Sequence, residues 1–224
     1  MMSRTRSLLL LTALLAAMAA CGGDNNGSSG TTTLSGALSL PPPAQCPGCS
    51  VGQVPIRLLA LKQNAGPTQL TASLTDAQGR YSFGNADAVL GGQTNVIVVA
   101  SVAQGAGLGG VEDLTVGSSN DKNFDVTTQV ACQASVYLTA GTQADGDPGC
   151  VVRPGCGPND VNCLLTRSPS ALDDAIITRL ERAAAFIAGQ VVLNANVPQA
   201  ACAVIDCTLG GAADATEQCV TSSF

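Results

Sequence analysis

Cysteine is the most chemically reactive kind of side chain in this 224-residue sequence. There are 10 cysteines, whereas histidine and tryptophan are absent. Without histidine the chain has no Ser-His or Cys-His nucleophile pair and no imidazole ligand for a metal ion. Neighbouring carboxylates do not make up for this, because Asp173 and Asp174 point about 100° apart on a helix and Glu112 and Asp113 point to opposite faces of a strand. We therefore predict a noncatalytic protein without a cofactor or metal ion.

One cysteine pair has the spacing of a redox motif. Cys46 and Cys49 enclose the sequence CPGC, between a PPPAQ stretch and a predicted strand. A redox CxxC pair needs one thiol whose pKa is lowered, usually at a helix N-terminus in a thioredoxin-like βαβ setting. Because no such setting surrounds CPGC, a local structural disulfide is the favoured interpretation. Thiol-redox chemistry by Cys46 and Cys49 is the alternative.

The first twenty residues have the pattern of an export signal. Arg4 and Arg6 precede an apolar run, residues 8–19, that is too short to span a bilayer comfortably. The run ends in Met-Ala-Ala-Cys, with the cysteine at position 21, followed by Gly22. This ending resembles the lipobox of bacterial lipoproteins, with methionine at position 18 where leucine is usual. An ordinary secretory signal is the alternative.

The resemblance implies that Cys21 is acylated, as with palmitate, and becomes the first mature residue. Two acyl signals at one residue give stable membrane anchoring, and the absence of aspartate after Cys21 implies the outer membrane of the cell envelope. Of 10 basic and 16 acidic side chains, cleavage after residue 20 would remove two arginines, which leaves 8 basic residues and a net charge of −8. Such a charge argues against nucleic acid as a partner.

Residues 21–33 are predicted to form a flexible tether, because they lack large apolar side chains and are rich in Gly, Ser, Asn and Thr. Beyond them, apolar residues alternate with the period of half-buried strands. The strand patterns are LSGALSL at 34–40, then Val54, Ile56, Leu58 and Ala60, then Leu70, Ala72 and Leu74, a continuous central run over 96–102, and closing strands at 111–116 and 123–126.

The stretch TDAQGRYSF, residues 75–83, combines a turn with core residues. Asp76 can accept hydrogen bonds from the turn backbone, and Gly79 can adopt a positive φ. Tyr81 and Phe83 alternate onto one face of the strand that follows. We predict that this stretch is a hairpin whose turn sets the strand register.

Together with a glycine in the first strand, Gly36, and the apolar strand VPIRL at 54–58, this motif resembles a carboxypeptidase regulatory-like domain. The resemblance implies a transthyretin-like β-sandwich of about seven strands, related to Cna B-type repeats, over residues 34–126. The insertion PPPAQCPGCS at 41–50 departs from the family pattern. Short alternating strands with turns between them independently favour a sandwich. The expected fold class is mainly β, transthyretin/Ig-like.

Residues 127–224 are predicted to form a partly helical, cysteine-rich C-terminal region. Ser170 to Asp173 fits a capping box before apolar residues at helical spacing, with Gly189 as a stop. Residues 127–139 fit either a helix or a strand, and a helix capped by Thr127 is favoured. A short helix is expected near 214–220. Because Leu59, Leu61, Ile97 and Val99 make the face opposite the sandwich core apolar, we expect the C-terminal helix to cover it.

In an exported protein this density of cysteines indicates a disulfide framework. With Cys21 acylated, nine cysteines remain, so one thiol is left over, and Cys132 in an apolar run is the expected buried one. The disulfide candidates are Cys46, Cys49, Cys150, Cys156, Cys163, Cys202, Cys207 and Cys219. The pairing cannot be deduced from the sequence.

These features predict a noncatalytic envelope lipoprotein with a binding or structural role. Its expected partners are the membrane, through the lipid on Cys21, and an envelope protein or glycan. A carbohydrate-binding surface module is a further alternative, weakened by an aromatic content of 3%.

Overall fold

The computed structural model describes residues 30–61, 67–92, 94–140, 172, 174–209 and 217–224. The chain separates into two units, residues 1–30 and 31–224, and the second contains all the elements below. The signal peptide, Cys21 and most of the tether lie outside the described residues, as do Cys150, Cys156 and Cys163.

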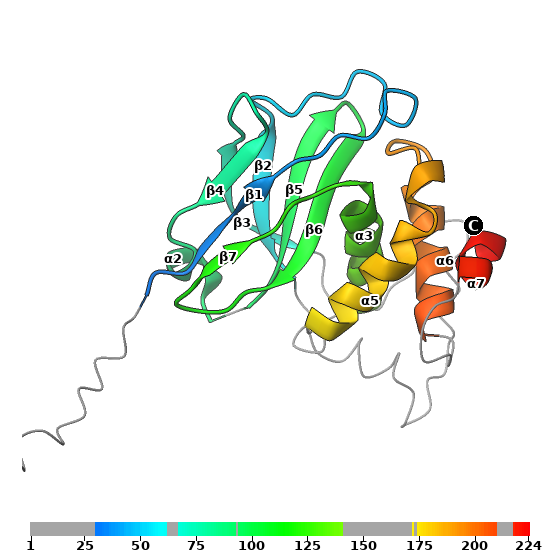
Figure 1. Cartoon of the computed structure of the whole chain (residues 1–224). Coiled ribbons are helices and arrows are strands. Elements are labelled where there is room, and N and C mark those ends of the chain that lie inside the picture. Colours follow the sequence, from blue (N-terminus) through cyan, green and yellow to red (C-terminus); the bar gives the residue numbers. More distant parts are fainter. Residues whose placement is uncertain (1–29, 62–66, 93, 141–171, 173, 210–216) are drawn as a thin grey trace, which may run out of the picture. The chain divides into compact units, whose positions relative to one another are not determined.

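The described strands form two sheets (Figure 1). The three-stranded sheet has the order β4-β1-β7, and the four-stranded sheet has the order β3-β2-β5-β6. The strands are β1 (Thr33–Ala37), β2 (Pro55–Ala60), β3 (Thr68–Leu74), β4 (Arg80–Phe83), β5 (Asn95–Ala103), β6 (Ala106–Asp113) and β7 (Ser119–Asp121). All pairs are antiparallel except β1 with β7.

Helices contribute slightly more of the described residues than strands do, so the prediction of a mainly β chain is confirmed only in part. The helices are α2 (Asp87–Leu90), α3 (Val126–Ala140), α5 (Asp174–Ala185), α6 (Val197–Leu209) and α7 (Glu217–Ser223), with a 3-10 turn η2 (Ala188–Gln190). Two packed sheets, seven strands and a partly helical C-terminal region with disulfides are present as expected. Helix α6 was not predicted from the sequence. Its residues are mostly small and apolar, so they do not separate into the polar and apolar faces that indicate a helix.

Strand β2 and the central strand β5 follow their sequence patterns. Ile56, Leu58 and Ala60 are buried, while Pro55 and Arg57 on the other face are exposed. β5 lies between β2 and β6 and is buried almost continuously over residues 95–100. A strand with neighbours on both sides and both faces partly covered needs apolar residues at successive positions.

The turn in TDAQGRYSF forms as predicted, but the hairpin does not. Asp76 Oδ1 accepts hydrogen bonds from the backbone N–H groups of Gln78 and Arg80 at 2.9 and 2.8 Å, and Gly79 has a φ of 78°. However, β3 pairs with β2 and β4 pairs with β1. The turn therefore carries the chain from one sheet to the other, which local turn chemistry cannot distinguish from a hairpin.

Tyr81 and Phe83 on β4 fill the core, as predicted. They are 4% and 6% exposed. The Tyr81 ring stacks on Phe124 with centroids 5.3 Å apart, and its hydroxyl donates a hydrogen bond to the Lys122 carbonyl oxygen at 2.6 Å. Burial, with Glu112 and Asp121 nearby, raises the pKa of Tyr81.

Only one of the alternating apolar residues of β3, Leu70, packs against the core, and it is half-buried. Ala72 pairs with the exposed Arg57 of β2, and Ala72 and Leu74 are themselves exposed. The inward-facing positions of β3 are Thr71 and Ser73, which pair with the buried Leu58 and Ile56. Alternation alone does not say which face of a strand is covered, so the prediction was wrong for Ala72 and Leu74.

The closing strands are shorter and differently placed than predicted. β6 ends at Asp113, and β7 lies at 119–121. In the predicted strand 123–126, Phe124 makes a single parallel bridge with Leu38, and Val126 begins α3.

Helix α3 confirms the favoured interpretation of residues 127–139, but its cap is Asp125 instead of Thr127. The Thr128 N–H donates to Asp125 Oδ1 at 2.9 Å, and the Asp125 N–H donates to Thr128 Oγ1 at 2.8 Å. This reciprocal pair satisfies a free N–H of the first helical turn.

Helix α5 confirms the predicted C-terminal helix, although most of its predicted capping box lies outside the described residues. Ile177, Leu180, Ala183 and Ala184 form its buried face, whereas Ile176, expected on that face, is only half-buried. The predicted short helix near 214–220 corresponds to α7, which begins at Glu217.

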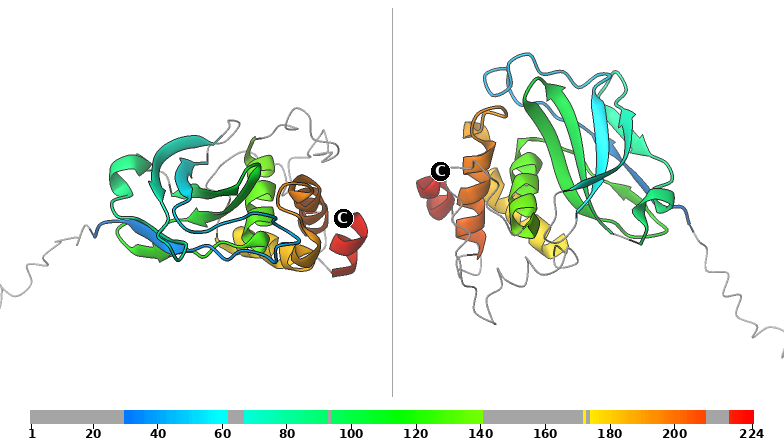
Figure 2. Two further views of the ribbon diagram at one scale, coloured as in Figure 1. Left: turned by 90° about the horizontal axis from the view of Figure 1, so that it is seen from above. Right: turned by 180° about the vertical axis from the view of Figure 1, so that it is seen from behind.

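Helices α3, α5 and α6 lie beside the β6 edge of the four-stranded sheet rather than over its outer face (Figure 2). α3 and α5 both contact β6. On the outer face Leu61 and Ile97 are buried and Leu59 and Val99 are half-buried. No described helix covers the end of that face formed by Pro55, Arg57 and Ala72, so the expectation that a helix covers it was wrong for this end.

Gly36 allows a close approach of two chain segments. A Cβ at position 36 would overlap the Lys122 carbonyl oxygen, which accepts the Tyr81 hydrogen bond. We expect Gly36→Ala to lower the free energy of unfolding by about 1–3 kcal/mol, as overpacking does. Chemical denaturation measures this. Gly84→Ala is the control, because a Cβ there meets open space; equal losses for the two variants would contradict the prediction.

Candidate functional site

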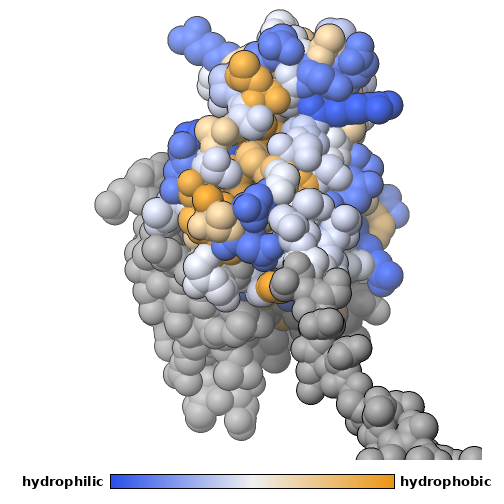
Figure 3. Space-filling view, turned by 90° about the vertical axis from the view of Figure 1, so that its left-hand side faces the viewer, coloured by the Kyte–Doolittle hydropathy of each residue, from blue (hydrophilic) through white to orange (hydrophobic). Residues whose placement is uncertain are grey.

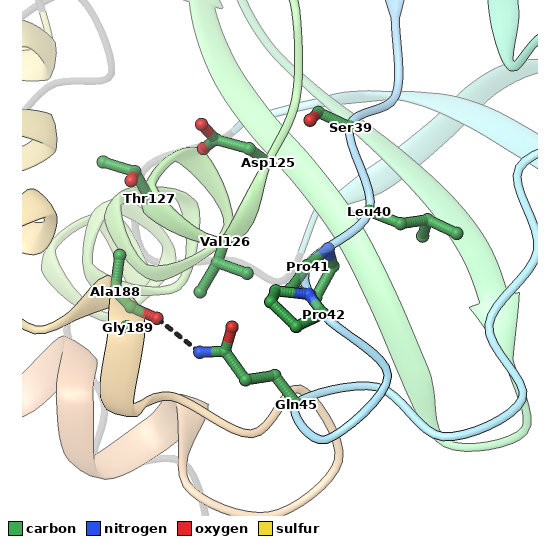
Figure 4. A pocket seen from close by; sticks show the side chains of 10 residues that line it. All are labelled: Ser39, Leu40, Pro41, Pro42, Gln45, Asp125, Val126, Thr127, Ala188 and Gly189. Atoms are coloured by element: carbon green, nitrogen blue, oxygen red, sulfur yellow. Dashed lines mark hydrogen bonds between the residues drawn. The ribbon is translucent and has the colours of Figure 1, made fainter.

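A groove of about 240 Å³ lies between the proline-rich loop, the start of α3 and η2 (Figure 4). Its walls are mostly apolar, and Asp125 is the one ionisable side chain among its lining residues. The lining residues are Ser39, Leu40, Pro41, Pro42, Gln45, Asp125, Val126, Thr127, Ala188 and Gly189. An apolar surface with a few polar groups is typical of a binding site.

The insertion at 41–50, which departs from the pattern of the resembled family, forms one wall of this groove. Three hydrogen bonds hold it against the C-terminal region. Gln45 Nε2 donates to the carbonyl oxygens of Ala188 and Val191 at 2.8 and 2.9 Å, and the Leu193 N–H donates to the Gln45 carbonyl at 3.0 Å. Proline residues cannot pair in a sheet interior, so this loop leaves the sheet and docks on η2 instead.

Asp125 sets the electrostatics of the groove. Its carboxylate accepts the Thr128 N–H and so compensates the positive end of the α3 dipole. Leu40, Pro41 and Val126 supply the apolar contact surface. The arrangement can hold an apolar or extended segment, and it brings no nucleophile next to a base.

Cys46 and Cys49 are joined by a disulfide at the far end of the same loop. Cys46 is 4% exposed, and Cys49 is half-buried against the core. Neither cysteine lies at the start of a described helix. Since thiol exchange requires an accessible sulfur with a lowered thiol pKa, this geometry favours a structural role over redox chemistry.

Cys207 and Cys219 form a second disulfide, which ties α7 to α6. Cys202 on α6 is disulfide-bonded as well. Cys202, Cys207 and Cys219 all lie in the helical region, on α6 and α7.

Cys132 is a free, buried thiol on α3, as expected from its apolar surroundings. Burial raises the pKa of Cys132 to about 12. Because the pKa is higher in the folded than in the unfolded chain, this group stabilises the fold below about pH 9, and the contribution is lost as the pH rises towards 12.

We expect iodoacetamide at pH 8 to leave Cys132 unmodified in the native protein and to label it once denaturant is added without reductant, because thiolate is the reactive form. Mass spectrometry of the alkylated peptides measures this. Rapid native labelling of Cys132 would contradict the prediction.

A cluster of three charges joins the sheets to α5. Lys122 Nζ lies 2.9 Å from Glu181 Oε1 and 3.3 Å from Glu112 Oε2, and all three side chains are largely buried. Burial lowers the pKa of Lys122, but Glu181 and Glu112 outweigh it and the pKa is raised. Burial also raises the pKa of Glu112, which shares one cation with a second carboxylate. The cluster is structural.

All six aromatic residues of the sequence fall within the described residues. Tyr81, Phe83, Phe124 and Tyr137 are buried, and Phe224 is half-buried. Phe186, at 40%, is the most exposed. A sugar-binding platform needs exposed rings, so this distribution does not favour carbohydrate binding.

The sequence motif and the groove lie on different parts of the fold. Asp76, Gly79, Tyr81 and Phe83 shape a turn and the core. The sequence analysis did not predict a role for Gln45 and Asp125, which shape the groove, because neither residue belongs to a recognisable motif. The departure of residues 41–50 from the family pattern was the one available signal.

Among the described residues there is no cluster of His, Cys, Asp or Glu that could hold a metal ion. None of the described helices has the length and apolar character needed to cross a bilayer.

Comparison with known proteins gives no close relative. No family model matches the sequence, and no curated protein matches it. Among solved structures, the chain is similar to a 9R-lipoxygenase from Cyanothece PCC8801, with a TM-score of 0.28 and 11% identity, over 81% of this chain and 25% of that chain. The chain thus spans about a quarter of the lipoxygenase, and a similarity this low carries no conclusion about fold or chemistry.

Proposed function

We propose that this protein is a noncatalytic, lipid-anchored protein of the bacterial cell envelope that binds a partner through the groove. The supporting observation is the groove itself, whose lining is mostly apolar and contains one ionisable side chain, Asp125. The proline-rich loop, which forms one wall of the groove, follows the C-terminal end of β1 (Figure 1).

In this proposal residues 34–126 are a carboxypeptidase regulatory-like sandwich, and residues 127–224 are an appended helical region. Two sheets with seven strands support it, as do Gly36 at a close approach and the Asp76–Gly79 turn. The helical region supplies η2 and α3 to the groove, so the binding surface would belong to both parts.

Two experiments test the proposal. Metabolic labelling with a palmitate analogue should mark the protein, and Cys21→Ser should abolish the label; a label that survives the substitution excludes the anchor. The lipidated protein should also fractionate with outer membranes.

For the groove, a photoreactive amino acid at Thr127 should crosslink a partner in cells. Gly189→Trp should suppress this crosslink, because a side chain at this exposed position meets open space and would fill the groove without a clash. Gly84→Trp is the matched control, since position 84 is equally open, directly follows β4 and is not among the residues that line the groove. A crosslink unaffected by Gly189→Trp would place the partner elsewhere.

A further inference from the structure

Two side-chain oxygens in the lining of the groove receive no hydrogen bond from the described part of the chain. Gln45 Nε2 donates to the carbonyl oxygens of Ala188 and Val191, and no described group donates to the Gln45 amide oxygen. Asp125 Oδ1 accepts the Thr128 N–H at 2.9 Å, which leaves Oδ2 without a donor among the described residues. A partner group that donates hydrogen bonds therefore finds free acceptors at this surface.

The charge at the groove is negative and unbalanced by a cation. Asp125 is half-buried and is the one ionisable side chain of the lining. The ion pairs found among the described residues join Lys122 to Glu112 and Glu181, and neither includes Asp125. The N-terminus of α3 offsets part of this charge, but Asp125 itself accepts a hydrogen bond from the first helical turn, so an anionic partner would meet a like charge there. The complementary group is a cation.

The groove combines apolar walls with this acidic group at one end. Asp125 lies towards one end and Gln45 towards the other, with Pro42 and Val126 between them (Figure 4). On the face shown in Figure 3, apolar side chains are instead scattered among hydrophilic ones. The volume of about 240 Å³ is below the range of about 300–1,000 Å³ for pockets that hold small molecules. The space suits one long side chain that buries an apolar stem and carries its charge at the tip.

The lining also distinguishes among cations. None of the described lining residues is aromatic, so a quaternary ammonium group, which binds to ring faces, is not matched. Asp125 Oδ1 is already used by Thr128, so the two oxygens are not both free for the paired hydrogen bonds of an arginine. A primary ammonium group needs only one of these oxygens.

We propose, on the basis of the function proposed above, that the groove takes a lysine side chain of a partner protein. The lysine stem lies over Pro42 and Val126, and its ammonium group donates to Asp125 Oδ2. The partner is thus a protein with an exposed lysine, which the net charge of −6 on this chain also attracts.

The small cation n-butylammonium, which has the length and charge of a lysine side chain, tests this recognition without a partner. Added to the mature chain with Cys21→Ser, it should shift the amide NMR signals of Thr127 and Gly189. The uncharged analogue 1-butanol should bind about threefold to fivefold more weakly, as for loss of one partly exposed ion pair. Raising the salt concentration should weaken the binding of n-butylammonium and leave that of 1-butanol unchanged.

Asp125→Asn tests the role of the carboxylate with little risk to the fold, because asparagine caps a helix as well as aspartate does. It should reduce the affinity for n-butylammonium to that for 1-butanol. Asp121→Asn is the matched control, because Asp121 is exposed and lies outside the groove lining, and it should leave both affinities unchanged. Equal binding of the two probes by the parent chain, or an n-butylammonium affinity that Asp125→Asn does not lower, overturns the lysine proposal.

The crosslink at Thr127 separates this proposal from the proposed function. If the partner inserts a lysine, Asp125→Asn should lower the crosslink yield as Gly189→Trp does, and Asp121→Asn should not. A crosslink that Gly189→Trp suppresses and Asp125→Asn leaves unchanged overturns the lysine proposal while partner binding at the groove stands. Selective n-butylammonium binding without any crosslink at Thr127 overturns the partner-binding function instead.

Discussion

Phe124→Ala is expected to lower the free energy of unfolding by about 3–5 kcal/mol, the range for removing a fully buried phenylalanine. Phe124 is completely buried, stacks on Tyr81 and lies against Gly110 of β6. Its backbone also makes the bridge to Leu38. One side chain therefore joins both sheets at the point where the chain enters α3.

Chemical denaturation under oxidising conditions, which keep the disulfides intact, measures this loss. Phe124→Leu should cost less, because it keeps most of the apolar contact and leaves a smaller cavity. Val116→Ala is the control, since Val116 is 59% exposed and should change stability by less than about 0.5 kcal/mol. A loss below about 1 kcal/mol for Phe124→Ala would mean that the two sheets do not depend on this contact.

Because Phe124 immediately precedes Asp125, its removal should also loosen the groove. Partner crosslinking at Thr127 should fall in Phe124→Ala even under conditions in which the protein remains folded. The same variant thus links core packing to the proposed binding surface.

Lys122→Met is expected to lower the free energy of unfolding by about 2–3 kcal/mol at pH 7. Removing one partner of a fully buried ion pair costs about 3–5 kcal/mol, and the 17% exposure of Lys122 reduces this through solvent screening. The substitution leaves Glu112 and Glu181 facing each other without a cation.

The loss should depend on pH, and its sign follows from the direction of the pKa shift. The pKa of Glu112 is raised in the fold, so the folded chain binds this proton more tightly than the unfolded chain does. The contribution is therefore fully present below the ordinary carboxyl pKa and is lost as the pH rises through the folded value. Without Lys122 the pKa should rise further, and the difference between variant and parent should be smaller at pH 4 than at pH 7.

Denaturant titrations at the two pH values measure this difference. The triple variant Lys122→Met, Glu112→Gln, Glu181→Gln is the matched control, because it removes the repelling carboxylates as well and should recover part of the loss at pH 7. A difference that is the same at pH 4 and pH 7 would contradict the electrostatic explanation and point to lost packing of the lysine stem.

The local features of this protein were determined by the sequence itself. Strands β2 and β5, the Asp76–Gly79 turn, helix α5 and the burial of Cys132 all follow from short-range causes. These causes are the two-residue alternation of strands, the hydrogen bonds of an aspartate in a turn, the helical period and the apolar surroundings of a thiol. None of them needs information from distant residues.

The pairing of strands and the covering of faces were decided only by the tertiary structure. The same turn could have joined two strands of one sheet, and the same alternation in β3 could have faced the core, because local chemistry is identical in both cases. Partners far along the chain made the difference: β1 for β4, and Arg57 for Ala72. The groove has the same origin, since it brings together segments near residues 40, 126 and 188 whose contact no short-range pattern records.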